Sequence, residues 1–199
     1  MMAWKFLAPG AIAPFTGACW PMPWGPHAGQ WMQGRSGEGV HACALGDLPY
    51  WLDDELWEVE LDAPIFRAAH QLVAVRGRLV TRIDAWPGAQ REFTGACIER
   101  TRRRVVGALV AAGRGPEADQ VRAERDLSAL RDLAARVADS GPFAVGYLFD
   151  AIRRRPYPGL CAYIAANAAA AIDGQGGHDE ERGAQVAWLA DGLKLRRSG

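Results

Sequence analysis

The sequence predicts an α+β protein, with a small, mostly antiparallel sheet in residues 1–86 packed on four or five helices in residues 87–199. Two observations lead to this fold class. Polar and apolar residues alternate along residues 56–61, which is typical of a half-buried strand. After Trp86 and Pro87 the apolar residues recur every three or four positions, which is typical of amphipathic helices. We therefore expect a β-rich domain and an all-helical domain, packed together as one unit.

The first half of the chain contains four candidate strands, which cover residues 3–7, 40–43, 56–61 and 70–83. In the third strand, Trp57, Val59 and Leu61 point to one face. Glu58 and Glu60 point to the other face. We expect Trp57 to be buried between the sheet and the first helix, with both glutamates facing away from that helix.

Three connecting features complete the first half. Residues 14–34 are dense in Pro and Trp, so we expect a structured loop over the core, with an aromatic ligand platform as the alternative. Asp47 is expected to cap a short helix over residues 49–52. Within residues 70–83, Arg76-Gly77 is either the turn of a hairpin or a bulge in one long strand.

The second half carries the helical pattern throughout. The predicted helices cover residues 89–113, 116–139, 143–155, 159–172 and 179–195. On the second of these, Arg122/Asp126 and Asp132/Arg136 have the spacing of exposed ion pairs. The glycine-rich residues 174–177 are expected to form a mobile linker.

Composition narrows the class of protein. No apolar run approaches the roughly 20 residues of a membrane span, and the N-terminus does not resemble a signal peptide. The four cysteines are isolated, which favours free thiols in the reducing cytoplasm. The net charge is zero, with −3 in residues 1–86 and +3 in residues 87–199. An offset this small makes a nucleic-acid partner unlikely on charge alone.

Several side chains are candidates for chemistry. Glu58 and Glu60 are close enough on a strand for one to serve as a general acid, although a solvent-facing surface is the simpler interpretation. His41 and Cys43 share a strand face, with Cys19 and His70 as further zinc ligands in principle. The spacing favours a core histidine beside a buried thiol, so we predict no metal site.

Two arginine clusters could meet a phosphate, but a solvated helix face is the simpler interpretation. They comprise Arg100 with residues 102–104, and residues 153–155. The sequence contains no complete nucleotide-binding loop, hydrolase elbow or zinc-protease motif.

A GxHAC…DL…VEL pattern runs through residues 39–43, 47–52 and 57–61. It resembles uncharacterised bacterial and phage-associated domains, a resemblance that implies no activity. The same order of elements is similar to small ADP-ribosyltransferases such as the rifampicin-modifying kind, which implies NAD as the cofactor.

That second resemblance assigns roles to five residues. His41 would contact the cofactor, and Tyr50 or Trp51 would stack on nicotinamide. Glu58 or Glu60 would stabilise the developing oxocarbenium charge. An ADP-ribosyltransferase-like enzyme, active or degenerate, is therefore one functional hypothesis.

The helical half leads to the other hypothesis. Residues 162–169 (AYIAANAA) and 181–189 (ERGAQVAWL) are similar to the endings of helical immunity proteins from bacterial toxin loci. This resemblance, together with the lack of a complete catalytic motif, favours a non-enzymatic interaction protein of the immunity or toxin–antitoxin type. Such a protein would have a protein partner.

Overall fold

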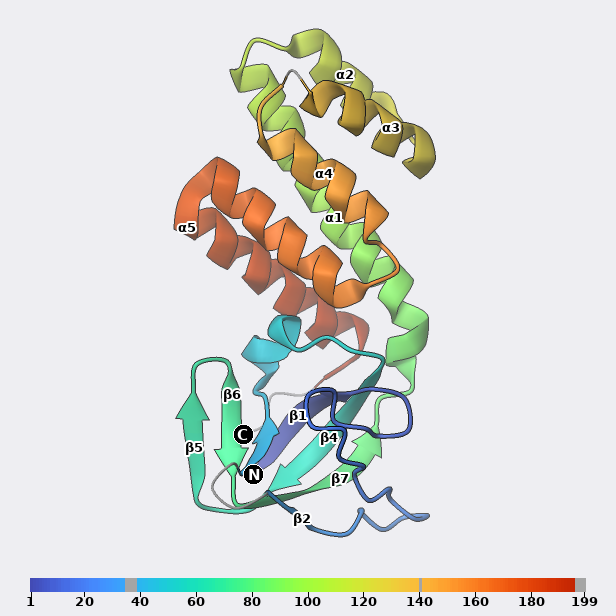
Figure 1. Ribbon diagram of the computed structural model, residues 1–199, viewed down its shortest axis with the longest axis vertical. Coiled ribbons are helices and arrows are strands. Elements are labelled where there is room, and N and C mark those ends of the chain that lie inside the picture. The colour runs from blue at the N-terminus through green and yellow to red at the C-terminus, as the bar shows by residue number, and fades with distance from the viewer. Residues whose placement is uncertain (35–38, 140, 196–199) are drawn as a thin grey trace. The chain divides into compact units, whose positions relative to one another are not determined.

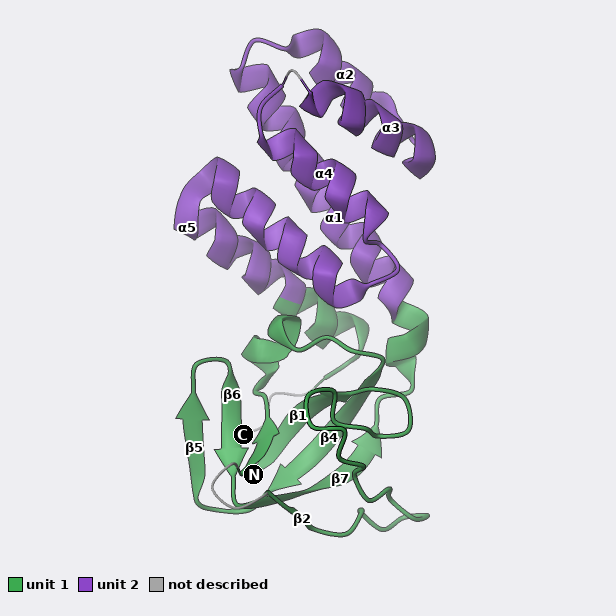
Figure 2. Cartoon of the chain, viewed as in Figure 1, with its two compact units in different colours: residues 1–89, 186–199 green, residues 90–185 purple. Residues whose placement is uncertain are grey.

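The computed structural model describes residues 1–34, 39–139 and 141–195, and its elements are labelled in Figure 1. The fold class is α+β, as the sequence predicts: antiparallel sheets in the first half and helices in the second. The chain forms two compact units (Figure 2). Unit 1 contains residues 1–89 and the stretch after residue 185, and unit 2 contains residues 90–185. The sequence-based division at residue 86 did not anticipate that the final segment returns to the first unit.

Unit 1 is built on two antiparallel sheets. The larger has the order β1 (Met2–Leu7), β4 (Glu55–Leu61), β7 (Arg76–Arg82), β2 (Met32–Gln33). The smaller has the order β3 (Val40–Ala42), β6 (Gln71–Ala74), β5 (Ile65–Ala68). Paired backbone hydrogen bonds of 2.9 and 2.7 Å between Trp4 and Cys43 join the two sheets at one point.

The prediction for residues 70–83 is wrong both as a hairpin and as one bulged strand. Strands β6 and β7 are separated by Val75 alone, yet they belong to different sheets, so the segment is neither a hairpin nor one bulged strand. The hairpin partner of β6 is β5, which the sequence analysis missed. Strand β5 is short and exposes Phe66 and Arg67, so it lacks the alternation that identifies half-buried strands.

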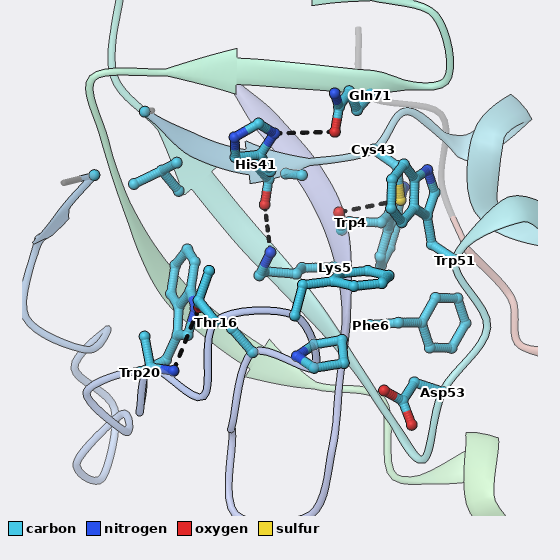
Figure 3. Close-up of a pocket in the computed structure, with 18 of the residues that line it drawn as sticks. Trp4, Lys5, Phe6, Thr16, Trp20, His41, Cys43, Trp51, Asp53 and Gln71 are labelled. Carbon is cyan, nitrogen blue, oxygen red and sulfur yellow. Dashed lines mark hydrogen bonds between the residues drawn. The ribbon is translucent and has the colours of Figure 1, made fainter. Parts of the chain in front are cut away.

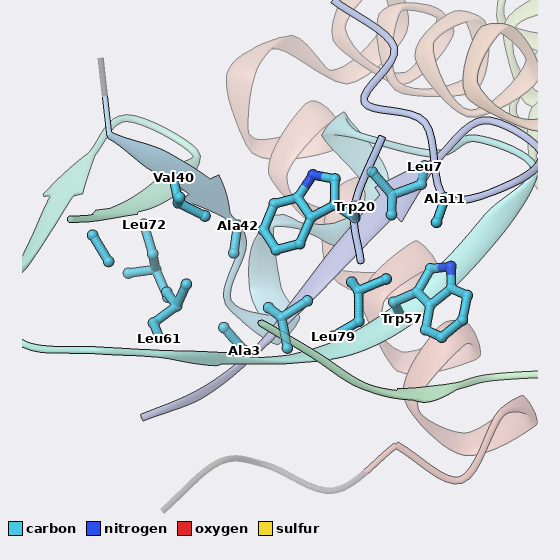
Figure 4. Close-up of a cluster of buried hydrophobic side chains, with 12 residues drawn as sticks. Ala3, Leu7, Ala11, Trp20, Val40, Ala42, Trp57, Leu61, Leu72 and Leu79 are labelled. Carbon is cyan, nitrogen blue, oxygen red and sulfur yellow. The ribbon is translucent and has the colours of Figure 1, made fainter. Parts of the chain in front are cut away.

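Trp57 lies in the apolar core of unit 1, as predicted, but the described members of its buried cluster come from strands and a loop and not from a helix. Its core neighbours include Leu7 and Leu79, and loop residues Ala11 and Trp20 belong to the same cluster (Figure 4). The first turn of the helix after the sheet instead meets the opposite face. That face carries Phe6 and Leu56, because apolar residues fill both sides of this part of the sheet.

The contact on the opposite face is specific. The rings of Phe6 and Trp86 are T-shaped with centroids 5.4 Å apart, and the indole of Trp86 donates a hydrogen bond of 2.6 Å to the Asp53 carbonyl. The prediction that Glu58 and Glu60 face away from the helix is therefore wrong, since the strand register places them on the face of Phe6.

A buried carboxylate fixes the loop over the core. Glu55 is 6% exposed and accepts hydrogen bonds from the backbone N–H groups of Gly10 and Ala11, at 3.1 and 3.2 Å. It also accepts one from the indole of Trp57 at 3.0 Å and lies 3.3 Å from the guanidinium of Arg82. These bonds tie the start of the loop to the edge of β4.

The short helix after β3 is a 3₁₀ helix, η1 (Leu45–Tyr50), and Asp47 lies inside it rather than capping it. The Asp47 side chain is buried, and its carboxylate accepts a hydrogen bond of 2.9 Å from Arg67 on β5. Asp47 therefore links η1 to the smaller sheet.

Helices α1 (Ala85–Ala111) and α5 (Pro158–Gly192) each contribute to both units. Unit 2 also contains α2 (Gly115–Ala123), α3 (Leu127–Ala138) and α4 (Ala144–Arg153). In this unit α3 packs on α2 and α4. The buried side chains of α3 and α4 follow the helical period that the sequence shows.

The helix predicted over residues 116–139 is broken at residues 124–126. Asp126 adopts an extended backbone and accepts a hydrogen bond of 2.8 Å from the N–H of Ala129, so it caps α3. Arg122 consequently pairs with Asp119 instead of Asp126. Asp132 pairs with Arg131 instead of Arg136. The expected ion pair treats Asp126 as a surface charge within one long helix. The preference of aspartate for the start of a helix is the stronger signal at this position.

The expected linker over residues 174–177 is also wrong. Only Gly174 departs from helical geometry, with φ 69° and ψ −161°, and Gln175 to Gly177 are helical. The chain doubles back at this residue (Figure 1), and Gln185 donates a hydrogen bond of 3.0 Å to the Ala162 carbonyl across the two arms. One glycine makes the reversal because its backbone conformation is available to glycine alone.

Candidate functional site

Unit 1 contains a cavity of about 660 Å³ (Figure 3). Its walls come from β1, the loop over residues 13–20, residues 32–34 and 39–43, and residues 50–53. This volume is within the roughly 300–1,000 Å³ of small-molecule sites. Most of the described lining is apolar or aromatic, and the charged side chains among these residues are Lys5 and Asp53.

The Lys5 amine is the central polar group of the cavity. Its Nζ donates a hydrogen bond of 2.5 Å to the backbone carbonyl of His41 and lies 5.2 Å from the centroid of the Trp20 ring (Figure 3). Among the residues that the structure describes, no carboxylate forms an ion pair with it. Burial lowers the pKa of Lys5 to about 8, and nearby Cys43 opposes this only in part.

Cys43 and His41 lie at the same wall. The Cys43 thiol donates to the carbonyl of Trp4 at 3.3 Å, and burial raises its pKa to about 12, so it stays protonated at neutral pH. The imidazole of His41 lies 2.9 Å from the side-chain oxygen of Gln71. Within the described ranges, no three His, Cys, Asp or Glu side chains are arranged to hold a metal ion.

Aromatic side chains form another wall. The Trp51 indole donates to the His70 carbonyl at 2.6 Å and meets the Phe15 ring edge to face at 6.1 Å. The Tyr50 ring stacks on the His70 ring, with centroids 3.7 Å apart and planes within 8°. These contacts fix the two rings that the ADP-ribosyltransferase resemblance had assigned to nicotinamide. The structure therefore brings His41, Tyr50 and Trp51 together at one cavity.

Glu58 and Glu60 do not line this cavity. The carboxylate of Glu60 forms an ion pair of 2.6 Å with Arg78 on the neighbouring strand. Glu58 is half-buried between Trp4 and Thr81 in the strand register. The carboxylate in the cavity lining is instead Asp53, whose pKa is raised above its ordinary value chiefly by burial.

Sequence reasoning missed the two charged residues of the site. Lys5 had a signal that was available: it is one of only two lysines in the chain, and it lies in a strand whose neighbours are otherwise apolar. Asp53 had none, since Asp53 and Asp54 are equivalent in sequence and only the fold turns the first toward the cavity.

The first arginine cluster has a structural role in unit 2. Arg100 makes a two-pronged contact with Glu181, at 2.9 and 2.8 Å, and Arg104 contacts Glu181 and Asp173. Buried Arg102 donates a hydrogen bond of 2.8 Å to the carbonyl of Val121. The interpretation of these three side chains as a solvated face is therefore wrong. Acids within the unit pair with Arg100 and Arg104, which also weakens the phosphate alternative.

Comparisons with protein-family models, curated proteins and solved structures found no match for this chain. Within the described residues, none of the helices combines the length and apolar character that crossing a membrane requires.

Proposed function

We propose that unit 1 binds a small, flat, mostly apolar molecule whose polar group contacts Lys5. The observation that carries the proposal is the position of a desolvated amine in an aromatic cavity, without a carboxylate partner among the described residues. Burying such a group costs stability, and groups with perturbed pKa values in a cleft are common at functional sites. The rigid rings of Trp20 and Trp51 supply flat apolar surfaces for the rest of the ligand.

The ADP-ribosyltransferase-like function is less well supported by this geometry. His41, Tyr50 and Trp51 line the cavity, but both glutamates assigned to the reacting ribose are absent from it. A dinucleotide also carries two phosphates, whereas Lys5 is the one lysine or arginine among the described residues of the lining. A smaller ligand with one polar group matches these side chains better.

Thermal unfolding tests the proposal directly. The panel contains aromatic acids, phenols, aldehydes and alcohols with one or two rings, and millimolar NAD tests the alternative. A ligand at 100 times its Kd stabilises the folded state by about 2.7 kcal/mol. For a chain of this size the melting temperature should rise by about 5–10 °C.

Two variants make the test specific. Lys5→Met should abolish or weaken the shift, and Lys194→Met, which removes the other lysine at an exposed position, should leave it unchanged. If no aromatic compound shifts the wild-type protein while NAD does, and Glu60→Gln removes that shift, the small-ligand function is wrong and the NAD-dependent function takes its place.

We propose a protein-interaction function for unit 2 as a second candidate. Leu160 and Tyr163, in the first turns of α5, are exposed by 46% and 59%, and their spacing of three places them in a stripe on one side of the helix; Tyr157, exposed by 57%, immediately precedes the helix. The arginines at residues 153–155 precede this stripe and form no ion pair among the described residues. An apolar stripe beside unpaired cations suits an acidic protein partner, as the immunity-type resemblance would require.

Co-expression with the products of neighbouring genes tests this candidate. An acidic neighbour should copurify in a fixed ratio and dissociate as salt is raised. Tyr163→Asp should abolish copurification, while Phe143→Asp, at an exposed aromatic that immediately precedes α4, should not. Equal loss with both variants would contradict the assignment of the surface.

A further inference from the structure

We propose that Lys5 forms a reversible imine with the carbonyl carbon of an aromatic or α,β-unsaturated aldehyde bound in the cavity. This inference rests on the proposed ligand-binding function of unit 1 and names the class of its ligand. Lys5 would then react covalently with the ligand as well as contact it.

The hydrogen-bond partners of Lys5 suit a neutral amine. An ammonium group has three N–H donors, and a neutral amine has two donors and a lone pair. The described residues offer Nζ two partners, the His41 carbonyl at 2.5 Å and the face of the Trp20 ring at 5.2 Å. Of the two, only the carbonyl accepts a hydrogen bond, so an ammonium group leaves two of its three donors without an acceptor among the described residues, whereas a neutral amine leaves one.

The surroundings increase the reactive fraction of the amine. With a pKa of about 8, roughly a quarter of Lys5 is neutral at pH 7.5, whereas about a thousandth of an ordinary lysine is. Lysines that react with carbonyl compounds are activated by desolvation in the same way. The thiol of Cys43 is a poor competitor, because its raised pKa keeps it protonated.

The cavity suits a flat carbonyl compound. Lys5 is half-buried and lines the cavity together with Trp20 (Figure 3). Phe15 belongs to the same lining. A conjugated aldehyde can lie against these rings while its carbonyl carbon meets Nζ. The apolar lining also limits water, which would hydrolyse the imine.

The step is balanced without a further reactant. The neutral amine nitrogen bonds to the carbonyl carbon, and the carbonyl oxygen leaves as water with the two hydrogens of the amine. No oxidation or reduction takes place, and addition of water reverses the step.

Reductive trapping tests the inference on the full chain. The protein is incubated at pH 7.5 with trans-cinnamaldehyde and sodium cyanoborohydride, and the labelled peptides are identified by mass spectrometry. We expect a reduced-imine adduct on Lys5, formed about tenfold or more faster than the same adduct on Lys194. The rate at Lys5 should reach half its maximum near pH 8. Labelling of Lys194 at an equal rate, or none at Lys5, would overturn the proposal.

Two comparisons separate this inference from the binding function on which it rests. Lys5→Arg keeps a cation in place and should fold with a similar melting temperature but give no adduct. Cinnamyl alcohol has the same ring and chain without the carbonyl group. If the alcohol raises the melting temperature and the aldehyde leaves Lys5 unlabelled, the cavity binds ligands and the imine is wrong. If neither compound has an effect, both proposals fail for this ligand class.

Discussion

Lys5 places a titratable amine where charge is costly, and this has a measurable effect on stability. Its pKa is about 8 in the folded state and near 10.5 in the unfolded chain, so between these values the unfolded state binds more protons. The free energy of unfolding should therefore rise with pH from about 8 to 10.5.

Urea denaturation at several pH values checks this expectation. The difference between the wild type and Lys5→Met isolates the contribution of the amine from other groups that titrate in the same range. Lys5→Met should remove the rise, and Lys194→Met should keep it. If the free energy of unfolding still rises with pH in Lys5→Met, another titrating group causes the rise.

Glu55 gives a pH dependence of the same sign as Lys5, but in the acidic range. Burial alone would raise the pKa of this carboxyl, but hydrogen bonds from Trp57, Gly10 and Ala11, with the charge of Arg82, lower it below its ordinary value. A lowered folded-state pKa means that this stabilisation is complete above the unfolded value, near 4.5, and is lost as pH falls through the folded one.

Glu55→Gln should destabilise the protein at pH 7. The two carboxylate oxygens of Glu55 share several donors, and the amide of glutamine has only one oxygen that can accept from them. We expect a cost of about 1–3 kcal/mol in urea denaturation. The difference from the wild type should shrink as pH falls below about 4.5. Glu58→Gln, on the same strand but half-buried, should change the free energy of unfolding by less. Equal costs for both variants would contradict the anchoring role of Glu55.

At the residue scale, the sequence predicted part of the candidate site. The resemblance identified His41, Tyr50 and Trp51, which do share a cavity. Alternation also placed Glu58 and Glu60 correctly on one strand face. It could not tell what covers that face, because a strand period fixes only which residues lie together. Lys5 and Asp53 needed the fold, since the cavity joins segments distant in sequence.

At the element scale, long periodic segments were predictable and interruptions were not. The ends of α1 and α4 lie near the predicted ones because their apolar stripes are continuous. Strand β5 and the change of sheet at Val75 depend on pairing partners, which no local pattern specifies. The prediction of a mobile linker over residues 174–177 is wrong because composition alone does not distinguish one glycine in an unusual backbone conformation from a flexible glycine-rich segment.

The reversal in α5 leads to a matched pair of variants. Gly174→Ala forces a side chain into φ 69°, ψ −161°, and should destabilise unit 2 by about 1–3 kcal/mol. Gly176→Ala lies in helical backbone with open space around its new methyl group, so it should be neutral or stabilising by about 0.4–1 kcal/mol. Thermal unfolding of both proteins checks the contrast. Equal effects would contradict a reversal confined to Gly174.

At the scale of the whole molecule, one unit is continuous in sequence and the other is not. Unit 2 is one uninterrupted stretch, whereas unit 1 combines the first 89 residues with the end of α5. Leu189 and Leu193 are buried in that final segment. The period of the sequence predicted this helix but could not assign it to a unit, because that depends on where the preceding reversal directs it.

Leu189→Ala should therefore weaken unit 1 in particular. A fully buried leucine cut to alanine costs about 2–5 kcal/mol. Hydrogen exchange should become faster in β1 and β4, with a smaller change in α3 and α4. Leu160→Ala, at an exposed position of the same helix, is the control and should alter neither region. Faster exchange in α3 and α4 alone would contradict the assignment of Leu189 to unit 1.

The discontinuity of unit 1 also sets an order of events on the ribosome. About 100 residues separate the last residue of its first segment from Leu189, and at about 5–20 residues per second their synthesis takes roughly 5–20 s. When the strands of the first segment leave the exit tunnel during that interval, the helix that completes their unit is not yet made. The helical insert, in contrast, is complete as soon as residue 185 leaves the exit tunnel. The strands that line the cavity are thus the part of the nascent chain that chaperones would have to protect longest.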